Sequence, residues 1–449
     1  MVAYLQMELT HGFRWRARSL DQVPPQDQAS VKSRFRAVKV SGGEHQVRVV
    51  SLSFALVLAA LTGFAAGCGS APPKTVTAAP KGQLLVFTQM LSPTVGWGLD
   101  TSGQVVRTSD GGRRWVTVST PAMAALLEPS TIHAGALYGG PSSESIAPSF
   151  LTGQIARIAV LSGPPYDSSG VLVFSTANGG GNWSEVKVAV PKSTTSLALS
   201  FPDARHGWLV GVEGGLAGSS AITIWRTSDG GQTWSQTSAE TTFNPTGIGF
   251  LNDTEGWLAG TSPAFNHVSL AETTNAGVSW RGETLAIPRG NYVVTTYPPI
   301  SVVLTTYPPL GTSGETAIMP LTLSGANSGK GGWVLFFRNS PSGLWQSLTP
   351  IAMPADLATA LQAPVYSFYG SQDGWVLMPL GSRTGYATRN RGLTWSRWQA
   401  PIGHYLSLQF VSPEVGYLLA WQNGRGQFWK TVNGGATWIQ VPYSIQAVP

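Results

Sequence analysis

The residues most able to do chemistry in this chain are its carboxylates, and 18 Asp and Glu residues follow Cys68. Acid–base cleavage of a glycosidic bond needs two of them facing each other across the scissile bond. Asp110 and Asp229 belong to a repeated motif, and no remaining pair stands in a distinctive context. Another group lies in recurring turns: Asp203, Asp253, Glu255, Asp373 and Glu414. The sequence therefore predicts no catalytic residue and no enzyme activity.

Histidine and cysteine do not indicate a metal site either. His11 and His45 precede the long apolar segment, and the other histidines are scattered singly: His133, His206, His267 and His404. Cys68 is the only cysteine, so neither an intrachain disulfide nor a cysteine cluster for a metal can form. The glycine run at 179–181 lies inside a copy of the repeated motif, which accounts for it without a phosphate-binding role. We expect no metal and no cofactor.

The repeated motif, called the box below, is clearest at Thr227–Trp234, which reads Thr-x-Asp-Gly-Gly-x-x-Trp. Every intact copy has an Asp or Asn followed five residues later by a Trp: Asp110 and Trp115, Asn178 and Trp183, Asp229 and Trp234, Asn275 and Trp280, Asn390 and Trp395, and Asn433 and Trp438. An altered seventh copy runs from Arg338 to Trp345, with Ser340 and Ser342 in place of the Asp and the Gly. Successive Trp residues lie 43 to 68 residues apart, a period typical of repeat architectures.

The box predicts a hairpin connection rather than a reaction site. Asp and Asn accept hydrogen bonds from backbone N–H groups two residues on, and Gly adopts positive φ without steric cost. The Trp would start the returning strand and carry apolar surface into the fold. A catalytic group would be expected once, not in every copy, so we interpret these residues as structural.

A second motif precedes most boxes and completes the repeat. It consists of an apolar residue, a polar turn and then Gly-Trp, as in Phe201 to Trp208; we assign it also to Gly332-Trp333. One unit then holds four short strands in about 45 residues, the size of a propeller blade. We predict an all-β, seven-bladed propeller of four-stranded antiparallel blades at 84–445, with approximate blade bounds of 84–120, 121–190, 191–240, 241–287, 288–350, 351–400 and 401–445.

Two long steps between boxes predict insertions in the second and fifth blades. They span 126–165 and 291–329, and the latter contains the near-copies Thr295–Pro299 and Thr305–Pro309. Long loops in compact domains are often functional, although we favour a tolerated duplication as the origin of the near-copies. Aromatic residues outside both motifs include Trp225 and Trp429, which we interpret as strand packing, and Trp398 and Trp421, which fit either packing or binding.

The N-terminal part differs from the rest in composition. Residues 1–48 are polar, with eight basic and four acidic residues, and show no apolar periodicity, so we expect disorder. This segment supplies four of the six net positive charges of the 449-residue chain. The remainder is close to neutral, which argues against a nucleic-acid partner.

Residues 49–68 form an apolar run that ends in Ala65-Ala66-Gly67-Cys68. This end resembles the lipobox of bacterial lipoproteins and predicts lipidation of Cys68, export, and attachment to the outer face of the cytoplasmic membrane. Ala65 replaces the usual Leu, and the long preceding segment favours a start codon assigned too early. An uncleaved membrane anchor or export to the periplasm or cell envelope are the alternatives. Residues 69–83 are rich in Pro and Ala and would form a tether.

Together, the box and the Gly-Trp motif resemble Asp-box, or bacterial neuraminidase (BNR), repeats, and more closely the propellers of the photosystem II stability and assembly factor family, over about 84–445. The resemblance implies a propeller of the WD40/YVTN-like kind. Relatives occur as exported proteins in many non-photosynthetic bacteria, so it implies no photosynthetic role.

We therefore expect a monomeric, lipid-anchored propeller that acts as a binding or assembly scaffold for a protein or glycan partner. The alternative is a glycoside hydrolase, sialidase-like or carbohydrate-binding propeller. Two carboxylates about 5–10 Å apart across a cleft would favour the enzyme.

Overall fold

The computed structural model has two compact units, 1–78 and 79–449. It describes residues 3–9, 13–19, 83–127, 146–163, 167, 169–214, 220–237, 244–261, 269–285, 302–306, 310–312, 316–325, 331–339, 343–348, 351–353, 365–378, 382–401 and 404–446. In the first unit, β1 (Ala3–Leu9) and β2 (Phe13–Ser19) pair as an antiparallel hairpin. Cys68, the apolar run and the tether up to residue 82 lie outside the described residues.

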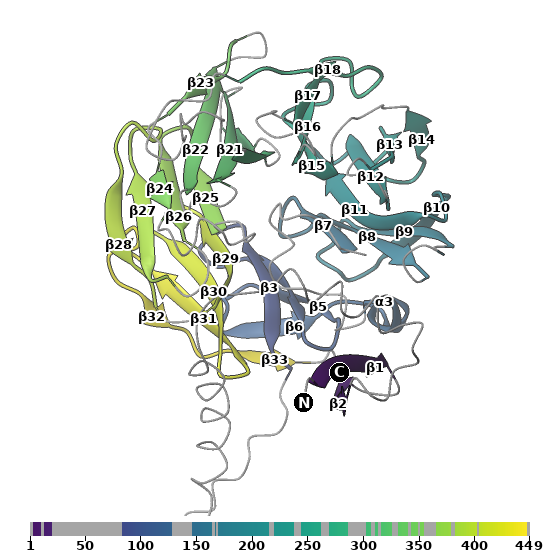
Figure 1. Cartoon of the computed structure of the whole chain (residues 1–449), viewed down its shortest axis with the longest axis horizontal. Helices are drawn as coiled ribbons and strands as arrows, with labels where there is room; N and C mark the ends of the chain where they lie inside the picture. Colours follow the sequence, from purple (N-terminus) through teal and green to yellow (C-terminus); the bar gives the residue numbers. More distant parts are fainter. Residues whose placement is uncertain are drawn as a thin grey trace, which may run out of the picture. The chain divides into compact units, whose positions relative to one another are not determined.

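The second unit is a seven-bladed β-propeller, with its sheets arranged around a common centre (Figure 1). Blade 1 comprises β3 (Leu85–Met90), β4 (Gly96–Asp100), β5 (Val105–Thr108) and β6 (Arg114–Thr117). Blade 2 comprises β7 (Ile146–Phe150), β8 (Ala156–Ser162), β9 (Gly170–Thr176) and β10 (Ser184–Val188). Blade 3 comprises β11 (Thr194–Ser200), β12 (Gly207–Glu213), β13 (Ile222–Thr227) and β14 (Ser235–Thr237).

The other blades follow in chain order. Blade 4 comprises β15 (Asn244–Phe250), β16 (Gly256–Thr261), β17 (Leu270–Thr273) and β18 (Arg281–Gly282). Blade 5 comprises β19 (Val302–Thr306), β20 (Leu310–Thr312), β21 (Thr316–Gly325), β22 (Gly331–Asn339), β23 (Gln346–Ser347) and β24 (Ile351–Met353). Blade 6 comprises β25 (Val365–Tyr369), β26 (Asp373–Leu377), β27 (Thr384–Thr388) and β28 (Ser396–Gln399). Blade 7 comprises β29 (His404–Phe410), β30 (Gly416–Gln422), β31 (Arg425–Thr431) and β32 (Ile439–Gln440).

Antiparallel register explains why the two motifs recur together. In blade 3 the Gly of Gly-Trp pairs with the box Thr, as Gly207 with Thr227, and the same pairing joins Gly416 to Thr431. The Phe ahead of the motif covers the Gly, because a Cβ at Gly207 would lie 2.3 Å from the Phe201 ring. The Gly-Trp motif and the box therefore pack together, with the Phe ring over the Gly and the Gly paired with the box Thr.

The predicted insertion in blade 2 is wrong over much of its length. Residues 126–165 contain β7 and β8, the first two strands of that blade. The Gly-Trp pattern did not reveal these strands, because Ala156 and Arg157 stand where Gly and Trp stand in other blades. Ala156 pairs with the box residue Thr176, as the Gly does elsewhere. Residues 128–145, between α3 and β7, lie outside the described residues.

The reading of blade 5 also needs correction. Gly332 and Trp333 lie in β22, which leads into the altered box, and not in the preceding strand. That preceding strand is β21, in which Ala317 pairs with Arg338. The described residues of the supposed insertion 291–329 thus belong to strands of the blade, namely β19, β20 and β21.

The ring is closed by a fifth strand on blade 1, which the sequence did not predict. Strand β33 (Ser444–Gln446) runs parallel to β6, with Ile445 opposite Trp115. Just before it, the Tyr443 hydroxyl accepts from Leu85 N at 3.2 Å and donates to Gly426 O at 3.1 Å. The end of the chain therefore joins blade 7 to blade 1.

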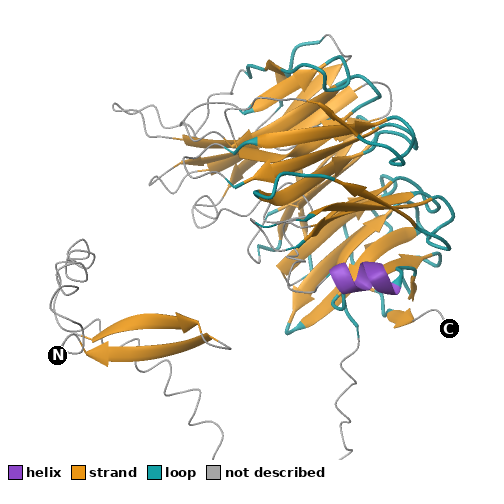
Figure 2. Ribbon diagram, turned by 90° about the vertical axis from the view of Figure 1, so that its right-hand side faces the viewer, coloured by secondary structure: helices purple, strands orange, loops and turns teal. Residues whose placement is uncertain are grey.

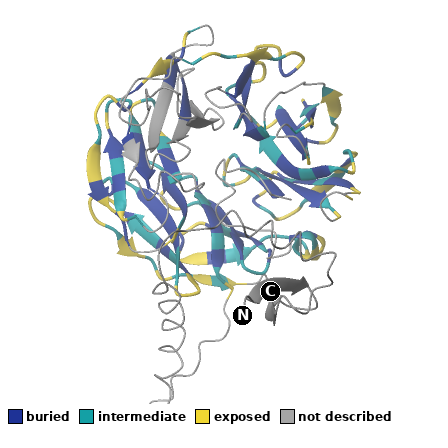
Figure 3. Ribbon diagram, viewed as in Figure 1, coloured by how far each residue is buried: buried dark blue, intermediate teal, exposed yellow. Residues whose placement is uncertain are grey.

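Buried residues run along the strands of every blade, and exposed ones gather in the outer turns (Figure 3). Helix α3 (Pro121–Leu126) follows blade 1 (Figure 2) and begins at Thr120, whose hydroxyl accepts from Met123 N at 3.2 Å. Met123 and Leu127 are fully buried with residues of blades 1 and 2. Among the described residues, no helix has the length and hydropathy needed to cross a membrane.

Candidate binding site

The six intact boxes share one hydrogen-bond pattern. The Thr hydroxyl accepts from the N–H of the Gly four residues on and donates to the Asp or Asn oxygen at 2.8–3.0 Å. At Thr227, that Gly is Gly231, with φ of +92°, and Asp229 Oδ1 accepts from Thr233 N at 3.0 Å. Slight burial raises the pKa of Asp229, but its hydrogen bonds with Thr233, Thr227 and Gln232 outweigh this and lower it to about 2. The box oxygens thus hold the turn.

The box Trp residues are less buried than the sequence suggested. Trp115 is fully buried, whereas the others of the intact boxes are half-buried: Trp183, Trp234, Trp280, Trp395 and Trp438. Each Trp opens the outermost strand of its blade, where no further strand covers it. Blade 1 is the exception because β33 covers β6. The Trp residues of the Gly-Trp motif are the fully buried ones: Trp97, Trp208, Trp257 and Trp375.

Hydrogen bonds from three of these buried Trp residues join neighbouring blades. The indole N–H of Trp97 donates to Thr152 O, that of Trp208 to Ala276 O and that of Trp375 to Gly434 O, each at 2.9 Å. In blade 2, Arg157 replaces the Trp and its Nε donates to Gly230 O at 2.8 Å. In these three blades and in blade 2, a donor at this position reaches the next blade.

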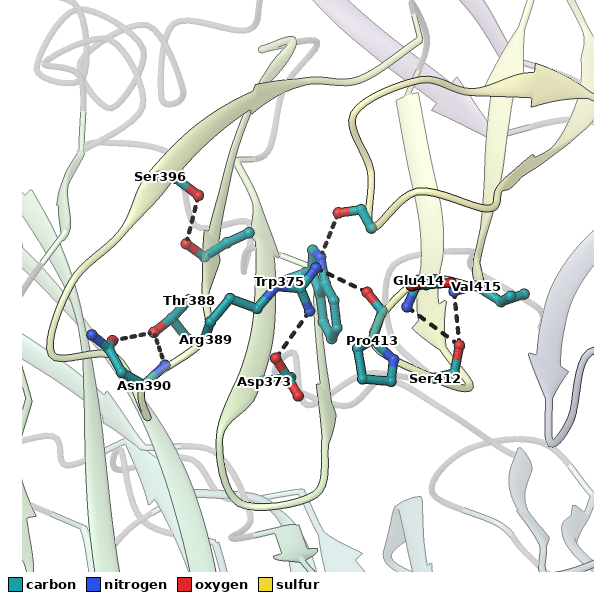
Figure 4. A network of polar contacts seen from close by, with 12 residues as sticks. Asp373, Trp375, Thr388, Arg389, Asn390, Ser396, Ser412, Pro413, Glu414 and Val415 are labelled. Carbon is teal, nitrogen blue, oxygen red and sulfur yellow. Dashed lines mark hydrogen bonds and ion pairs between the residues drawn. The ribbon is translucent and has the colours of Figure 1, made fainter.

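Blades 6 and 7 are joined by a further group of contacts (Figure 4). Arg389, in the box of blade 6, contacts Asp373 Oδ1 at 2.9 Å and donates to Pro413 O of blade 7 at 2.9 Å. Its guanidinium lies 4.6 Å from the centre of the Trp375 ring. These contacts join blade 6 to blade 7 beside the Trp375 indole.

A groove of about 560 Å³ lies between these two blades. Blade 6 and its connection contribute Arg383, Gln399, Ala400 and Pro401 to the lining, and blade 7 contributes Gln422, Gln427, Trp429, Ala436, Thr437, Trp438 and Gln440. The volume falls within the range of small-molecule sites, ~300–1,000 Å³. Amide and indole groups dominate this lining, and it contains one charged side chain, Arg383, and no carboxylate.

The walls of the groove are fixed by hydrogen bonds. The Tyr405 hydroxyl donates to Pro401 O, and burial raises the pKa of Tyr405 to about 12, so the hydroxyl keeps its proton at neutral pH. Arg383 Nε donates to Ala400 O at 3.1 Å. On the other wall, Asn433 of the box accepts from Thr437 N at 2.9 Å and donates from Nδ2 to the Thr437 hydroxyl at 2.8 Å.

The residues that follow the last strands of blades 6 and 7 differ in size. Ala400 lies five residues after the box Trp395, and Tyr443 lies five residues after the box Trp438. Tyr443 packs against the cluster that contains Leu85, Trp115 and Phe428. Ala400, which lines the groove between blades 6 and 7, carries only a methyl group.

A close group of charged side chains lies elsewhere, between blades 4 and 5. Arg338, which takes the place of the box Thr, contacts Glu272 Oε1 at 2.6 Å and Glu255 Oε1 at 3.8 Å, and all three side chains are at most 5% exposed. Arg281 bridges Glu272 and Glu283 at 3.1 and 3.0 Å. Burial and the neighbouring Glu272 raise the pKa of Glu283 to about 7. Burial also raises the pKa of Glu272, but its hydrogen bond with Glu283 and the Arg338 charge outweigh this and lower it.

The carboxylates of Glu272 and Glu283 are both held by arginine contacts. Arg338 and Arg281 occupy the space beside Glu272, and the pair is not part of the groove lining. Among the described residues, no group of three or more His, Cys, Asp or Glu is placed to hold a metal.

The sequence identified some groove residues but not the groove. Asn433 and Trp438 were predicted as box residues, and the latter lines the groove. Trp429 was interpreted as strand packing, but it is half-buried and lines the groove, whereas the equivalent Trp225 is buried. Four glutamines went unremarked: Gln399, Gln422, Gln427 and Gln440. The clustering of these glutamines between residues 399 and 440 was the sequence signal that could have indicated the groove. The predicted lipidation site, Cys68, lies outside the described residues.

The fold and its repeated turns define a box-containing, BNR-type β-propeller. A family model described as "Photosynthesis system II assembly factor YCF48" matches residues 175–288, from the end of blade 2 through blade 4. The chain thus resembles the photosystem II assembly factor propellers. No curated protein matches it.

Several solved structures are similar to the chain. The GH74 xyloglucanase from Xanthomonas campestris is 12% identical with a TM-score of 0.49, covering 79% of this chain and 52% of that chain, so this chain spans about half of its length. YCF48 from Cyanidioschyzon merolae is 16% identical with a TM-score of 0.43, covering 79% and 96%. YCF48 bound to D1 peptide is 15% identical with a TM-score of 0.38, covering 67% and 81%. At these identities, the likenesses say nothing about what the chain binds.

Proposed function

We propose that the protein is a binding or assembly scaffold without a reaction of its own, and that its partner, a protein or a cell-surface ligand, docks in the groove between blades 6 and 7. The observation that carries this proposal is the groove itself, a recess lined by amides and indoles. Its lining lacks the paired carboxylates that glycoside hydrolysis needs. The family-model match to an assembly factor supports a scaffold role.

The place of action is a further part of the proposal. The apolar run at 49–66 and Cys68 support an exported, lipid-anchored monomer on the outer face of the cytoplasmic membrane. Mass spectrometry of the mature N-terminus tests this directly. A chain that begins at a lipid-modified Cys68 is expected, and an unprocessed chain that begins at Met1 would refute it.

A capture experiment tests the scaffold role and its site together. The full chain would serve as bait on membranes and cell-envelope extracts, beside a groove variant, Gln422→Ala/Gln427→Ala/Gln440→Ala. Gln236→Ala is the matched control, because Gln236 pairs with Trp225 in blade 3 as Gln440 pairs with Trp429 in blade 7. We expect capture by the wild type and the control but not by the groove variant. Equal capture by all three would place the site elsewhere.

Turnover assays address the enzyme alternative. We expect no hydrolysis of glycoside substrates by the wild type. Activity that is lost in Glu283→Gln or Glu272→Gln would contradict the scaffold proposal and would make the pair between blades 4 and 5 catalytic.

A further inference from the structure

We infer that the ligand of the groove is a neutral glycan, an inference that rests on the proposed binding function and gives it a chemical class. Three features of the groove favour such a ligand: its hydrogen-bonding groups, its low charge and its short strand edge.

The amides of Gln422 and Gln427 are paired so that each keeps one group for a ligand. Gln427 Nε2 donates to Gln422 Oε1 at 3.2 Å. This contact leaves the Gln422 amide nitrogen as a donor beside the Gln427 amide oxygen as an acceptor. A sugar hydroxyl both donates and accepts, so two neighbouring hydroxyls on one ring complement this pair. Gln399 and Gln440 extend the same chemistry along the groove.

The indoles add the apolar part of the recognition. Trp429 and Trp438 are both half-buried, so each still offers ring surface to a ligand. Trp438 is backed by the buried Trp398, with ring centres 5.6 Å apart, which limits its motion. An aromatic ring held in place presents an apolar surface at little cost in conformational entropy. The C–H face of a sugar ring matches such a surface, while its hydroxyl edge faces the amides.

Charge argues against ionic ligands. The lining has no carboxylate to attract a basic segment, and Arg383 is its only cation. A polyanion is usually bound by several basic groups, because each neutralised charge adds to affinity. A neutral ligand is therefore favoured over both.

The blade 7 edge of the groove also argues against an added peptide strand. Peptides that extend a sheet bind through a row of open backbone groups. The strand beside Trp429 and Trp438 is β32, which is only two residues long, Ile439–Gln440. Side chains, rather than a long strand edge, form this surface.

Binding measurements on the full chain test the inference. An array of neutral oligosaccharides, acidic polysaccharides and peptides would identify the class, and calorimetry would give Kd for the best binder. We expect a neutral oligosaccharide to bind, with Kd raised at least about tenfold in Gln422→Ala/Gln427→Ala, a loss of ~1.4 kcal/mol, and unchanged in Gln236→Ala. Unchanged thermal unfolding of the double variant would show that it remains folded.

The alternative outcomes separate this inference from the proposed function. Preference for an acidic polysaccharide, or a peptide bound at the groove without any neutral glycan, would overturn the ligand class and leave the scaffold role intact. A neutral glycan whose Kd is the same in the double variant would place the glycan outside the groove. No binding by any probe, together with capture that ignores the groove variant, would overturn both.

Discussion

Replacing Arg338 with Leu should destabilise the propeller strongly, because this residue neutralises two buried carboxylates. Its guanidinium is 2.6 Å from Glu272 and 3.8 Å from Glu255, and the side chains are 5%, 2% and 4% exposed. It also lies 5.6 Å from the centre of the Trp257 ring and 5.8 Å from that of Trp345. Leucine would leave both carboxylates in a poorly hydrated place.

The expected size of the effect follows from the geometry. Removing one partner of a buried ion pair costs about 3–5 kcal/mol, because the remaining charge has lost its counterion. Arg281 stays in contact with Glu272 at 3.1 Å, so we expect the lower end of this range, about 3 kcal/mol. The exposed Arg389–Asp373 pair is the control. Arg389 is 47% exposed, and Arg389→Leu should cost about 1 kcal/mol or less.

Urea unfolding followed by tryptophan fluorescence at pH 5 and pH 8 would measure these losses. Without Arg338, the folded-state pKa of Glu272 rises, because the Arg338 charge holds it down in the wild type, so the loss of stability grows as pH rises. The destabilisation should therefore be larger at pH 8. Arg338→Leu/Glu255→Leu/Glu272→Leu should recover much of it, since a buried ionic group can be replaced by apolar residues. A loss below about 1 kcal/mol that is equal at both pH values would refute this reasoning.

Three further predictions concern side-chain contacts between and within blades. Trp208→Ala should cost about 3–5 kcal/mol and Trp234→Ala clearly less, because Trp208 is fully buried and Trp234 is half-buried; equal losses in urea unfolding would contradict this. Tyr443→Phe should cost about 1–3 kcal/mol, because Leu85 N and Gly426 O lose their partner at the closure, and a thermal-unfolding midpoint equal to that of the wild type would count against it. Burial and the neighbouring Glu272 raise the folded-state pKa of Glu283 to about 7, above the ordinary Glu value of 4.5, so its contribution to stability is present below pH 4.5 and is lost as pH rises to about 7. Glu283→Gln should flatten the stability profile in this window, and an unchanged slope would argue against the raised pKa.

Local turn chemistry made the architecture predictable. The box hydrogen bonds join residues at most four positions apart, so Thr, Asp or Asn, and Gly specify the turn without help from the rest of the chain. Counting these turns gave the number of blades. The prediction failed where a blade used other side chains for the same task, as with Arg157 in blade 2 and Ala317 in blade 5.

The interpretation of Arg338 shows the limit of motif reading. From the sequence, Arg338 at the box Thr position is one more departure of the altered copy from the motif. In the structure, it is the cation at the centre of a buried cluster whose other members lie in blade 4. Its partner Glu272 is 66 residues away in the sequence, so no local pattern could reveal the contact.

The sequence alone determined the all-β class, the repeat and the seven blades, because these depend on interactions within single hairpins. Tertiary structure decided which Trp residues are buried, how β33 closes the ring, and that a groove opens between blades 6 and 7. The groove residues span 383–440 and meet only because two blades pack face to face. Such a site depends on the space left between elements, which sequence periodicity does not encode.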